Sequence, residues 1–145
     1  MLGLSQLPQS GRIHLLVVED EDVDALNVQR ALRGVATIET LTRVRDGVEG
    51  LAWLRARNDL HRVVVLSDLR MPRMSGLEML EAIRSDPQLA ALSVVFLTTS
   101  SDERDLDSAS RLHIAGYLTK CLDGSRFMAA LRAFADYWSL SLVPR

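Results

Sequence analysis

Three short apolar runs constrain the fold of this chain more than any other feature. Residues 13–18, 63–66 and 94–97 are almost entirely aliphatic or aromatic. Runs of this length and composition predict β-strands that are buried on both faces, as in a parallel sheet covered by helices. Two weaker strand patterns occur at residues 36–41 and 116–118. The sequence therefore predicts five strands.

Amphipathic stretches alternate with these strands and predict five helices, near residues 23–33, 47–56, 76–85, 102–112 and 124–138. Three helix starts have the spacing of a capping box: Asp46 with Glu49, Ser75 with Glu78, and Ser100 with Glu103. Four side chains of the last helix share one face, which should cover the sheet: Phe127, Leu131, Phe134 and Trp138. The alternation predicts a doubly wound α/β fold, with helices on both faces of one parallel sheet.

The composition is that of a single globular domain. The chain has 145 residues, of which 48% are hydrophobic and 25% charged, and domains commonly have this size and balance. We expect a lead segment at residues 1–12, one domain at 13–138 and a short tail at 139–145. This division leaves little room for an output domain.

Charge, cysteine content and hydropathy argue against several classes of protein. The chain has 17 Lys and Arg against 19 Asp and Glu, and its net charge of −2 disfavours nucleic-acid binding. The single cysteine, Cys121, cannot form an internal disulfide and gives no sign of an oxidising compartment. No apolar run is long enough to cross a bilayer, so we expect no membrane association and a cytoplasmic location.

Polar residues follow the predicted strands at the edge of the sheet where the carboxyl ends meet. Open α/β sheets bind ligands at this edge, because loop backbones and helix amino termini converge there. The residues after the first, third, fourth and fifth strands are Glu19, Asp20, Glu21 and Asp22, then Asp68, then Thr98, Thr99 and Ser100, then Lys120. We expect carboxylates, hydroxyls and one ammonium to meet there.

These side chains favour phosphoryl chemistry assisted by a metal ion. Neighbouring carboxylates repel one another unless a cation offsets their charge, and Mg²⁺ prefers carboxylate and phosphate oxygens. Asp68 can attack a phosphoryl donor and form an aspartyl phosphate. Lys120 would then neutralise the phosphoryl oxygens, and the hydroxyl of Thr98 would donate a hydrogen bond to one of them.

Four motifs resemble those of the response-regulator receiver domains of bacterial two-component systems. They are LLVVED at 15–20, LSDLRMPRMSG at 66–76, FLTTS at 96–100 and GYLTK at 116–120. The resemblance covers nearly all of residues 13–138 and implies a flavodoxin-like sheet with strand order 2-1-3-4-5. It implies phosphorylation by a sensor histidine kinase and signalling through the surface of the fourth helix, fifth strand and fifth helix.

The resemblance also implies the role of each site residue. Asp68 is the phosphoacceptor, and Thr98 and Lys120 assist it. The groups that hold Mg²⁺ are Glu19, Asp20, Asp68 and the backbone carbonyl of Arg70. Thr98 and Tyr117 form a switch, while Arg70 and Ser100 are candidates for side chains that set the lifetime of the phosphoryl group.

Within the family, the chain is most similar to single-domain regulators associated with bacterial phytochromes. This similarity lies in the DLRMP loop at 68–72, in Ser85-Asp86-Pro87, in TTSSDERD at 98–105 and in the aromatic carboxyl end. It implies a red-light-sensing histidine kinase as partner and a homodimer formed through the last helix and tail. The interface candidates are Phe127, Tyr137, Trp138, Leu140 and Leu142.

Two departures from the family pattern, at Cys121 and Arg70, leave a second interpretation open. Cys121 follows Lys120 where the family usually has proline after a cis bond, so we expect a trans bond and a shifted loop. Cys121 and Arg70 favour the alternative of a phosphorylation-independent dimer or scaffold.

Two functions on similar folds are disfavoured by particular residues. A metal-dependent phosphohydrolase would carry a second Asp where Arg70 stands, and a flavin carrier would need a Ser/Thr-rich loop where the acidic run begins at Glu19. We expect a signalling module rather than an enzyme.

Overall fold

The computed structural model describes residues 12–99, 103–120 and 124–140. Five parallel strands form one sheet in the order β2-β1-β3-β4-β5. The strands are β1 (Ile13–Val18), β2 (Ile38–Val44), β3 (Val63–Asp68), β4 (Ser93–Thr98) and β5 (Gly116–Thr119). The predicted fold class and strand order are confirmed.

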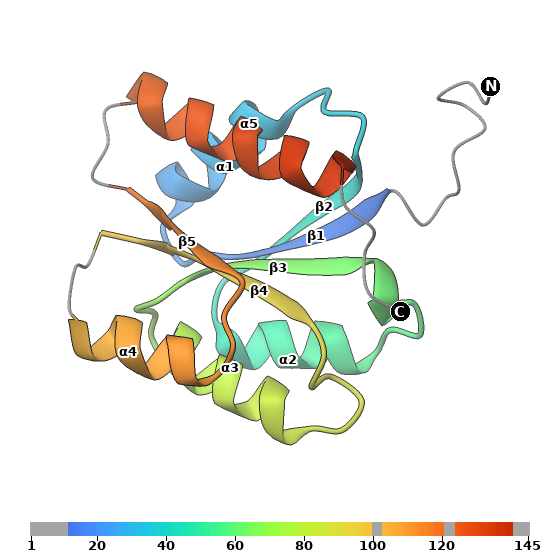
Figure 1. The fold of residues 1–145 in the computed structure, drawn as a ribbon, viewed down its shortest axis with the longest axis vertical. Helices are drawn as coiled ribbons and strands as arrows, with labels where there is room; N and C mark the ends of the chain where they lie inside the picture. Colours follow the sequence, from blue (N-terminus) through green and yellow to red (C-terminus); the bar gives the residue numbers. More distant parts are fainter. Residues whose placement is uncertain (1–11, 100–102, 121–123, 141–145) are drawn as a thin grey trace.

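Helices cover both faces of this sheet (Figure 1). They are α1 (Asp22–Leu32), α2 (Gly47–Arg55), α3 (Gly76–Ser85), α4 (Glu103–Arg111) and α5 (Gly124–Leu140), and a short 3₁₀ helix, η3 (Leu60–Arg62), precedes β3. Helices α1 and α5 lie on one face, and α2, α3 and α4 lie on the other. Helix α5 continues two residues past the predicted end at 138, so the start of the predicted tail lies inside this helix.

Two strands differ from their predicted ranges by more than one residue at an end, because strand pairing, rather than local pattern, sets their ends. Strand β2 was expected at 36–41 but begins at Ile38 and ends at Val44, which pairs with Val18 of β1. As an edge strand it is only partly buried, so its sequence shows weak alternation. Strand β3 extends to Asp68, which pairs with Leu97 of β4.

The helix starts follow the predicted capping pattern where the structure describes them. Ser75 and Glu78 form a complete capping box at the start of α3. At α2, the side chain of Asp46 accepts a hydrogen bond from the backbone N–H of Glu49 at 3.0 Å. Ser100 lies outside the described residues.

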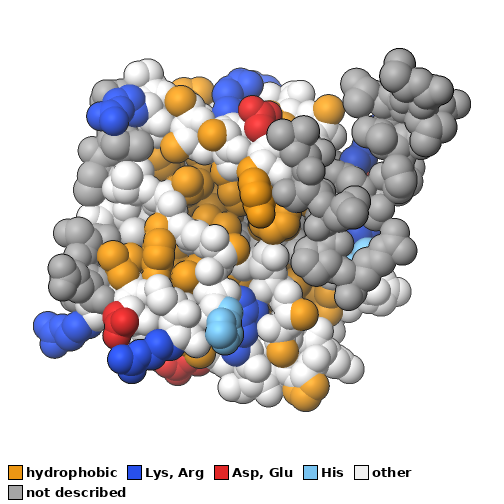
Figure 2. Space-filling model, viewed as in Figure 1, with side chains coloured by type: hydrophobic (Ala, Val, Ile, Leu, Met, Phe, Trp, Pro, Cys, Tyr) orange, Lys and Arg blue, Asp and Glu red, His pale blue; other side chains and the backbone are white. Residues whose placement is uncertain are grey.

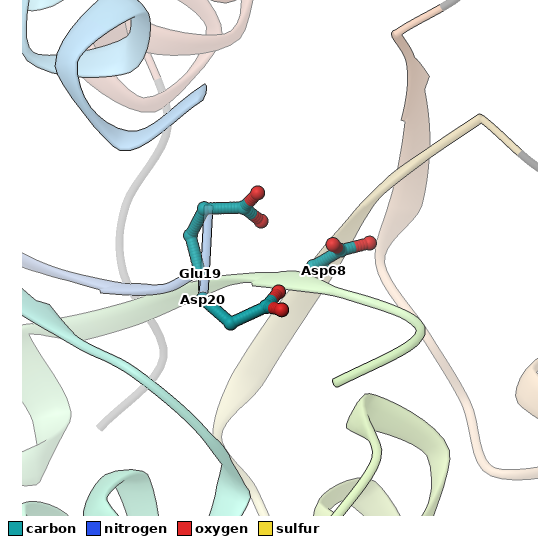
Figure 3. A group of neighbouring side chains, drawn as sticks. All are labelled: Glu19, Asp20 and Asp68. Carbon is teal, nitrogen blue, oxygen red and sulfur yellow. The ribbon is translucent and has the colours of Figure 1, made fainter. Parts of the chain in front are cut away.

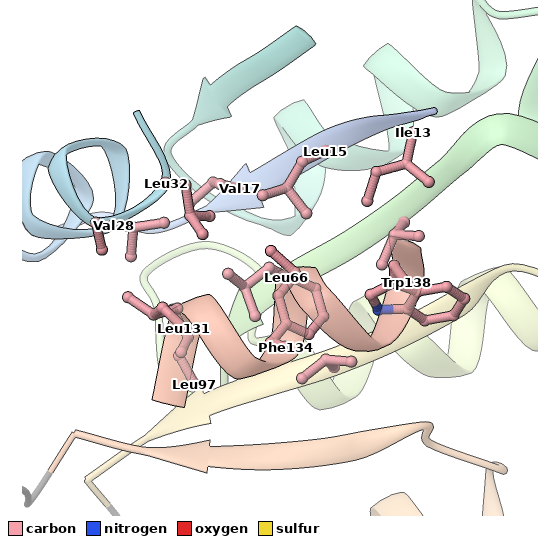
Figure 4. Close-up of a cluster of buried hydrophobic side chains, with 14 of the residues drawn as sticks. Ile13, Leu15, Val17, Val28, Leu32, Leu66, Leu97, Leu131, Phe134 and Trp138 are labelled. Carbon is pink, nitrogen blue, oxygen red and sulfur yellow. The ribbon is translucent and has the colours of Figure 1, made fainter. Parts of the chain in front are cut away.

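One hydrophobic core fills the space between the sheet and helices α1 and α5 (Figure 4). The predicted face of α5 is confirmed, because all four of its side chains are buried in this core: Phe127, Leu131, Phe134 and Trp138. Phe127 and Trp138 had also been predicted as interface residues. Both are less than 9% exposed, so in this structure they belong to the core of the monomer and not to its surface.

Candidate functional site

Three carboxylates meet at the carboxyl ends of β1 and β3. Glu19 directly follows β1 and is fully buried, Asp20 comes next, and Asp68 is the last residue of β3. Each offers one oxygen, and these atoms all lie within 4.8 Å of one another. Figure 3 shows the carboxylates of Glu19 and Asp20 turned toward Asp68. The structure thus brings together the acidic residues that the sequence predicted for this edge.

Lys120 places its ammonium in the same cluster. Its backbone N–H donates to the carbonyl of Thr98 at 2.9 Å, which holds the end of β5 beside the end of β4. Its Nζ lies 2.8 Å from Oε1 of Glu19 and 3.3 Å from Oδ2 of Asp68. Cys121, whose effect on this loop was predicted, lies outside the described residues.

Burial and neighbouring charges shift the pKa values of Glu19 and Lys120. Burial raises the pKa of Glu19 to about 8, although the hydrogen bond from Lys120 acts against this rise and the charge of Asp68 adds to it. The pKa of Lys120 is also raised: burial lowers it, but hydrogen bonds to neighbouring carboxylates outweigh burial. Burial and the nearby charge of Asp68 therefore favour the protonated form of Glu19.

These donors fit a hard divalent cation. Oε2 of Glu19 is buried and has no hydrogen-bond partner among the described residues, and a buried carboxylate oxygen normally has one. Carboxylate oxygens are the ligands that Mg²⁺ prefers, and it typically takes one or two of them from the protein. The orphaned oxygen and the short separations therefore indicate that these carboxylates could hold a divalent cation.

The loop after Asp68 is held by short backbone contacts. Oδ1 of Asp68 accepts a hydrogen bond from the N–H of Leu69 at 2.7 Å, and Oδ2 faces Lys120. Gly76, at the start of α3, donates its N–H to the carbonyl of Leu69 at 2.9 Å. The exposed side chain of Arg70 turns to α4, where its Nη2 lies 2.8 Å from Oδ2 of Asp105.

The two predicted switch residues lie on neighbouring strands. Thr98 ends β4 and is 5% exposed. Tyr117 of β5 is half-buried, its ring lies 6.4 Å from that of Phe96, and its hydroxyl donates to the carbonyl of Leu106 in α4 at 2.7 Å. This hydrogen bond therefore connects the Tyr117 side chain of β5 to α4.

The remaining predicted residues lie away from this cluster or outside the described part of the chain. Tyr137 is 62% exposed on α5 and is thus available to a partner. Leu140 belongs to α5, and its side chain is not described. Ser100 and Leu142 lie outside the described residues.

Sequence reasoning missed one residue of the cluster, Asp24. Its Oδ2 accepts a hydrogen bond from Nζ of Lys120 at 3.0 Å. It lies in the first turn of α1, four residues after Asp20. Asp20 precedes this helix, so helical spacing gave no signal for Asp24, and only the contact with Lys120 brings it into the cluster.

Comparisons with known proteins agree with this fold. The family model described as response regulator receiver domain matches residues 15–132. The chain is 30% identical over 128 residues to "Response regulator Rcp1" of Synechocystis sp., covering 86% of this chain and 87% of Rcp1. Within the described residues, no helix is long and apolar enough to cross a membrane.

Two solved structures of cyanobacterial regulators are similar throughout. The phosphorylated phytochrome response regulator RcpA is 31% identical with a TM-score of 0.83, and the match covers 92% of this chain and 99% of RcpA. The Mn²⁺-bound form of Rcp1 is 30% identical with a TM-score of 0.80 and the same coverage. By sequence and fold, this chain belongs to the response-regulator receiver family.

Proposed function

We propose that this chain is a single-domain response regulator that accepts a phosphoryl group on Asp68 from a sensor histidine kinase. The observation that carries the proposal is the approach of Lys120 Nζ to within 3.3 Å of Asp68 Oδ2, beside the acidic pair. A nucleophilic carboxylate, its counter-ion and a candidate metal site are thus within one cluster. RcpA, a relative of similar length, was solved in a phosphorylated form.

In this reaction a carboxylate oxygen of Asp68 attacks the phosphorus of a phosphohistidine. The new O–P bond forms as the P–N bond breaks, and the electron pair of that bond leaves with the imidazole. Lys120 offsets charge on the transferred oxygens, and Thr98 donates its hydroxyl to one of them. Mg²⁺, held by Glu19, Asp20, Asp68 and the carbonyl of Arg70, would supply further positive charge and orient the phosphoryl group.

Phosphorylation would alter the surface formed by α4, β5 and α5, and a partner would recognise this change. Phosphorylation draws the hydroxyl of Thr98 toward the new phosphoryl group, which frees space for the ring of Tyr117. The hydroxyl of Tyr117 donates a hydrogen bond to the carbonyl of Leu106, so movement of the ring would change the contact that holds α4. Figure 2 shows hydrophobic side chains on the face that β5 crosses between α5 and α4, where a partner can dock.

The relatives indicate the partners that we propose. RcpA is a phytochrome response regulator, and a red-light-sensing histidine kinase is therefore the proposed donor. Exposed Tyr137 of α5 is the proposed contact of a homodimer. We assign the chain no catalytic turnover beyond taking up the phosphoryl group and losing it slowly to water.

The intact mass after incubation with acetyl phosphate and Mg²⁺ tests the proposal. We expect a gain of about 80 Da, one phosphoryl group, in the wild type. The gain should disappear in Asp68→Asn and after chelation of the metal. Asp107→Asn is the control, because Asp107 is an exposed residue of α4 that pairs with Arg111 and should leave the gain intact.

A folded wild type that gains no mass would refute phosphorylation on Asp68. That result would favour the phosphorylation-independent dimer or scaffold that Arg70 and Cys121 raised as an alternative. A gain that persists in Asp68→Asn would place the modification on another residue.

A further inference from the structure

We propose that Asp24 is a positioning residue that keeps the ammonium of Lys120 in the phosphorylation site while a metal ion is bound. The inference rests on the proposed function, because it concerns the lysine that would face the phosphoryl group. It assigns a role to a helix residue outside the group of candidate metal ligands.

Lys120 is enclosed by three carboxylates, and its side chain is only 8% exposed. Two of them, Glu19 and Asp68, lie at the ends of β1 and β3. The third, Asp24, reaches the ammonium from α1, with Oδ2 3.0 Å from Nζ. An ammonium has three N–H donors, and each of these carboxylates can accept one.

The three carboxylates are not equivalent toward a metal ion. Glu19 and Asp68 belong to the group whose oxygens lie within 4.8 Å of one another, and Asp24 does not. A divalent cation among these oxygens would engage Glu19 and Asp68 and would repel the neighbouring ammonium. Asp24 would still be available to pair with Lys120. It is therefore the contact that keeps the ammonium from turning out to solvent.

The position of Asp24 on a packed helix suits this role. It lies in the first turn of α1, where the helix dipole favours negative charge. The next turn is held in place by the buried side chains of Ala25 and Val28, and Val28 packs in the core beneath α5. A carboxylate on such an element keeps its position better than one on a loop.

The sequence makes the ammonium directly observable. Lys120 is the sole lysine of the 145 residues, so protein labelled with ¹⁵N-lysine gives one side-chain ammonium signal. With saturating MgCl₂ we expect this signal in the wild type, because hydrogen-bonded, enclosed ammonium protons exchange slowly with water. It should be lost in Asp24→Asn and partly restored in Asp24→Glu.

Glu21→Gln is the matched control. It removes one charge from the same acidic run, yet the Glu21 side chain is exposed and has no hydrogen bond or ion pair within the described part of the chain. The ammonium signal should persist in this variant. An unchanged signal in Asp24→Asn would overturn the proposal.

A double-mutant cycle on phosphorylation by acetyl phosphate and MgCl₂ gives a second measurement. Asp24→Asn should slow phosphorylation about tenfold, the effect of losing one charged hydrogen bond. In a Lys120→Ala background it should have no further effect. If Asp24→Asn instead accelerates the reaction, or slows it equally without Lys120, Asp24 acts through its charge alone and the proposal fails.

The two measurements separate this inference from the proposed function. A wild type that takes up no phosphoryl group would refute the function, while the ammonium signal would still decide whether Asp24 holds Lys120. A wild type that is phosphorylated, with an Asp24→Asn variant indistinguishable from it in both measurements, would refute only the inference.

Discussion

Gly76 illustrates how one residue determines the shape of the phosphoacceptor loop. A Cβ atom at this position would lie 2.2 Å from the backbone carbonyl oxygen of Asp68 and 3.1 Å from Cα of Leu69. Backbone atoms cannot move aside as the end of a flexible side chain can. Glycine is therefore required for the start of α3 to approach the end of β3 this closely.

Gly76→Ala should destabilise the protein by about 3 kcal/mol, because the loop must shift to admit the methyl group. Urea denaturation measures the change. Gly116→Ala is the control: among the described residues, nothing beyond its two chain neighbours lies within 4 Å of its Cβ position, and its effect should stay within about 0.5 kcal/mol. Equal unfolding midpoints for the two variants would contradict the close approach.

Glu19 makes metal binding depend on pH. Burial raises its pKa to about 8 in the metal-free protein, despite the opposing hydrogen bond from Lys120. A metal ion binds the ionised carboxylate, so binding at pH 7 should release close to one proton. The affinity for Mg²⁺ should rise with pH, approaching tenfold per unit below the pKa of Glu19 and levelling off above it.

Isothermal titration calorimetry in two buffers of different ionisation enthalpy measures that proton release. Glu19→Gln should bind Mg²⁺ more weakly and release no proton. If the wild type releases no proton at pH 7, Glu19 is already ionised and burial does not raise its pKa as described.

At the scale of secondary-structure elements, Arg84 joins α3 to two loops on the same face of the sheet. Its guanidinium donates to four backbone carbonyls: Ala90 at 2.9 Å, Leu92 at 2.7 Å, Leu112 at 2.7 Å and His113 at 3.1 Å. The first two precede β4 and the last two follow α4. Burial lowers the pKa of Arg84, and only a planar group with several fixed donors reaches all these acceptors.

Arg84→Lys should lower the free energy of unfolding by about 2 kcal/mol, because an ammonium leaves several of these carbonyls without a donor. Thermal or urea unfolding measures the loss. Arg111→Lys is the control, since Arg111 is 79% exposed and pairs only with Asp107 in the described structure. An Arg84→Lys variant as stable as wild type would show that water replaces the lost donors.

The elements also show where prediction from sequence succeeded. Strands β1, β3 and β4 were evident because burial on both faces makes their sequences continuously apolar. The half-exposed edge strand β2 was misplaced by two or three residues at its ends, because its pairing with β1 decides its position. The helix starts at α2 and α3 followed from local capping chemistry.

At the scale of the whole molecule, helix α5 has one face in the core and another face that is open to a partner. On α5, Tyr137 is 62% and Met128 38% exposed, although the opposite face of this helix is buried in the core. Exposed aromatic side chains are common at interfaces. Helix α5 can thus stabilise the monomer with one face and contact a second copy with the other.

If α5 forms the homodimer interface, Tyr137→Ser should shift the protein toward the monomer. Sedimentation velocity at several concentrations measures the change. Val48→Ser is the control: Val48 is 42% exposed on α2, across the sheet from α5, and its loss should leave the dimer intact. A wild type that stays monomeric at all concentrations, or a Tyr137→Ser variant that remains a dimer, would exclude this interface.

The sequence by itself determined the alternation of strands and helices and the edge at which the acidic pair, Asp68 and Lys120 meet. Both follow from local rules: hydrophobic patterns define the strands, and the carboxyl ends of parallel strands lie together. Only the tertiary structure decided which side chains touch across that edge. Asp24 and Lys120 are separated by 96 positions, and no local pattern connects them.

Tertiary packing also decides which of two neighbouring residues of α5 is buried. Tyr137 and Trp138 are adjacent aromatics, and both looked suitable for an interface. The helix turns about 100° per residue, so Trp138 points into the core between α5 and the sheet while Tyr137 faces solvent. Local sequence limits which faces a helix can present, but packing against the sheet and α1 decides which side chain is covered.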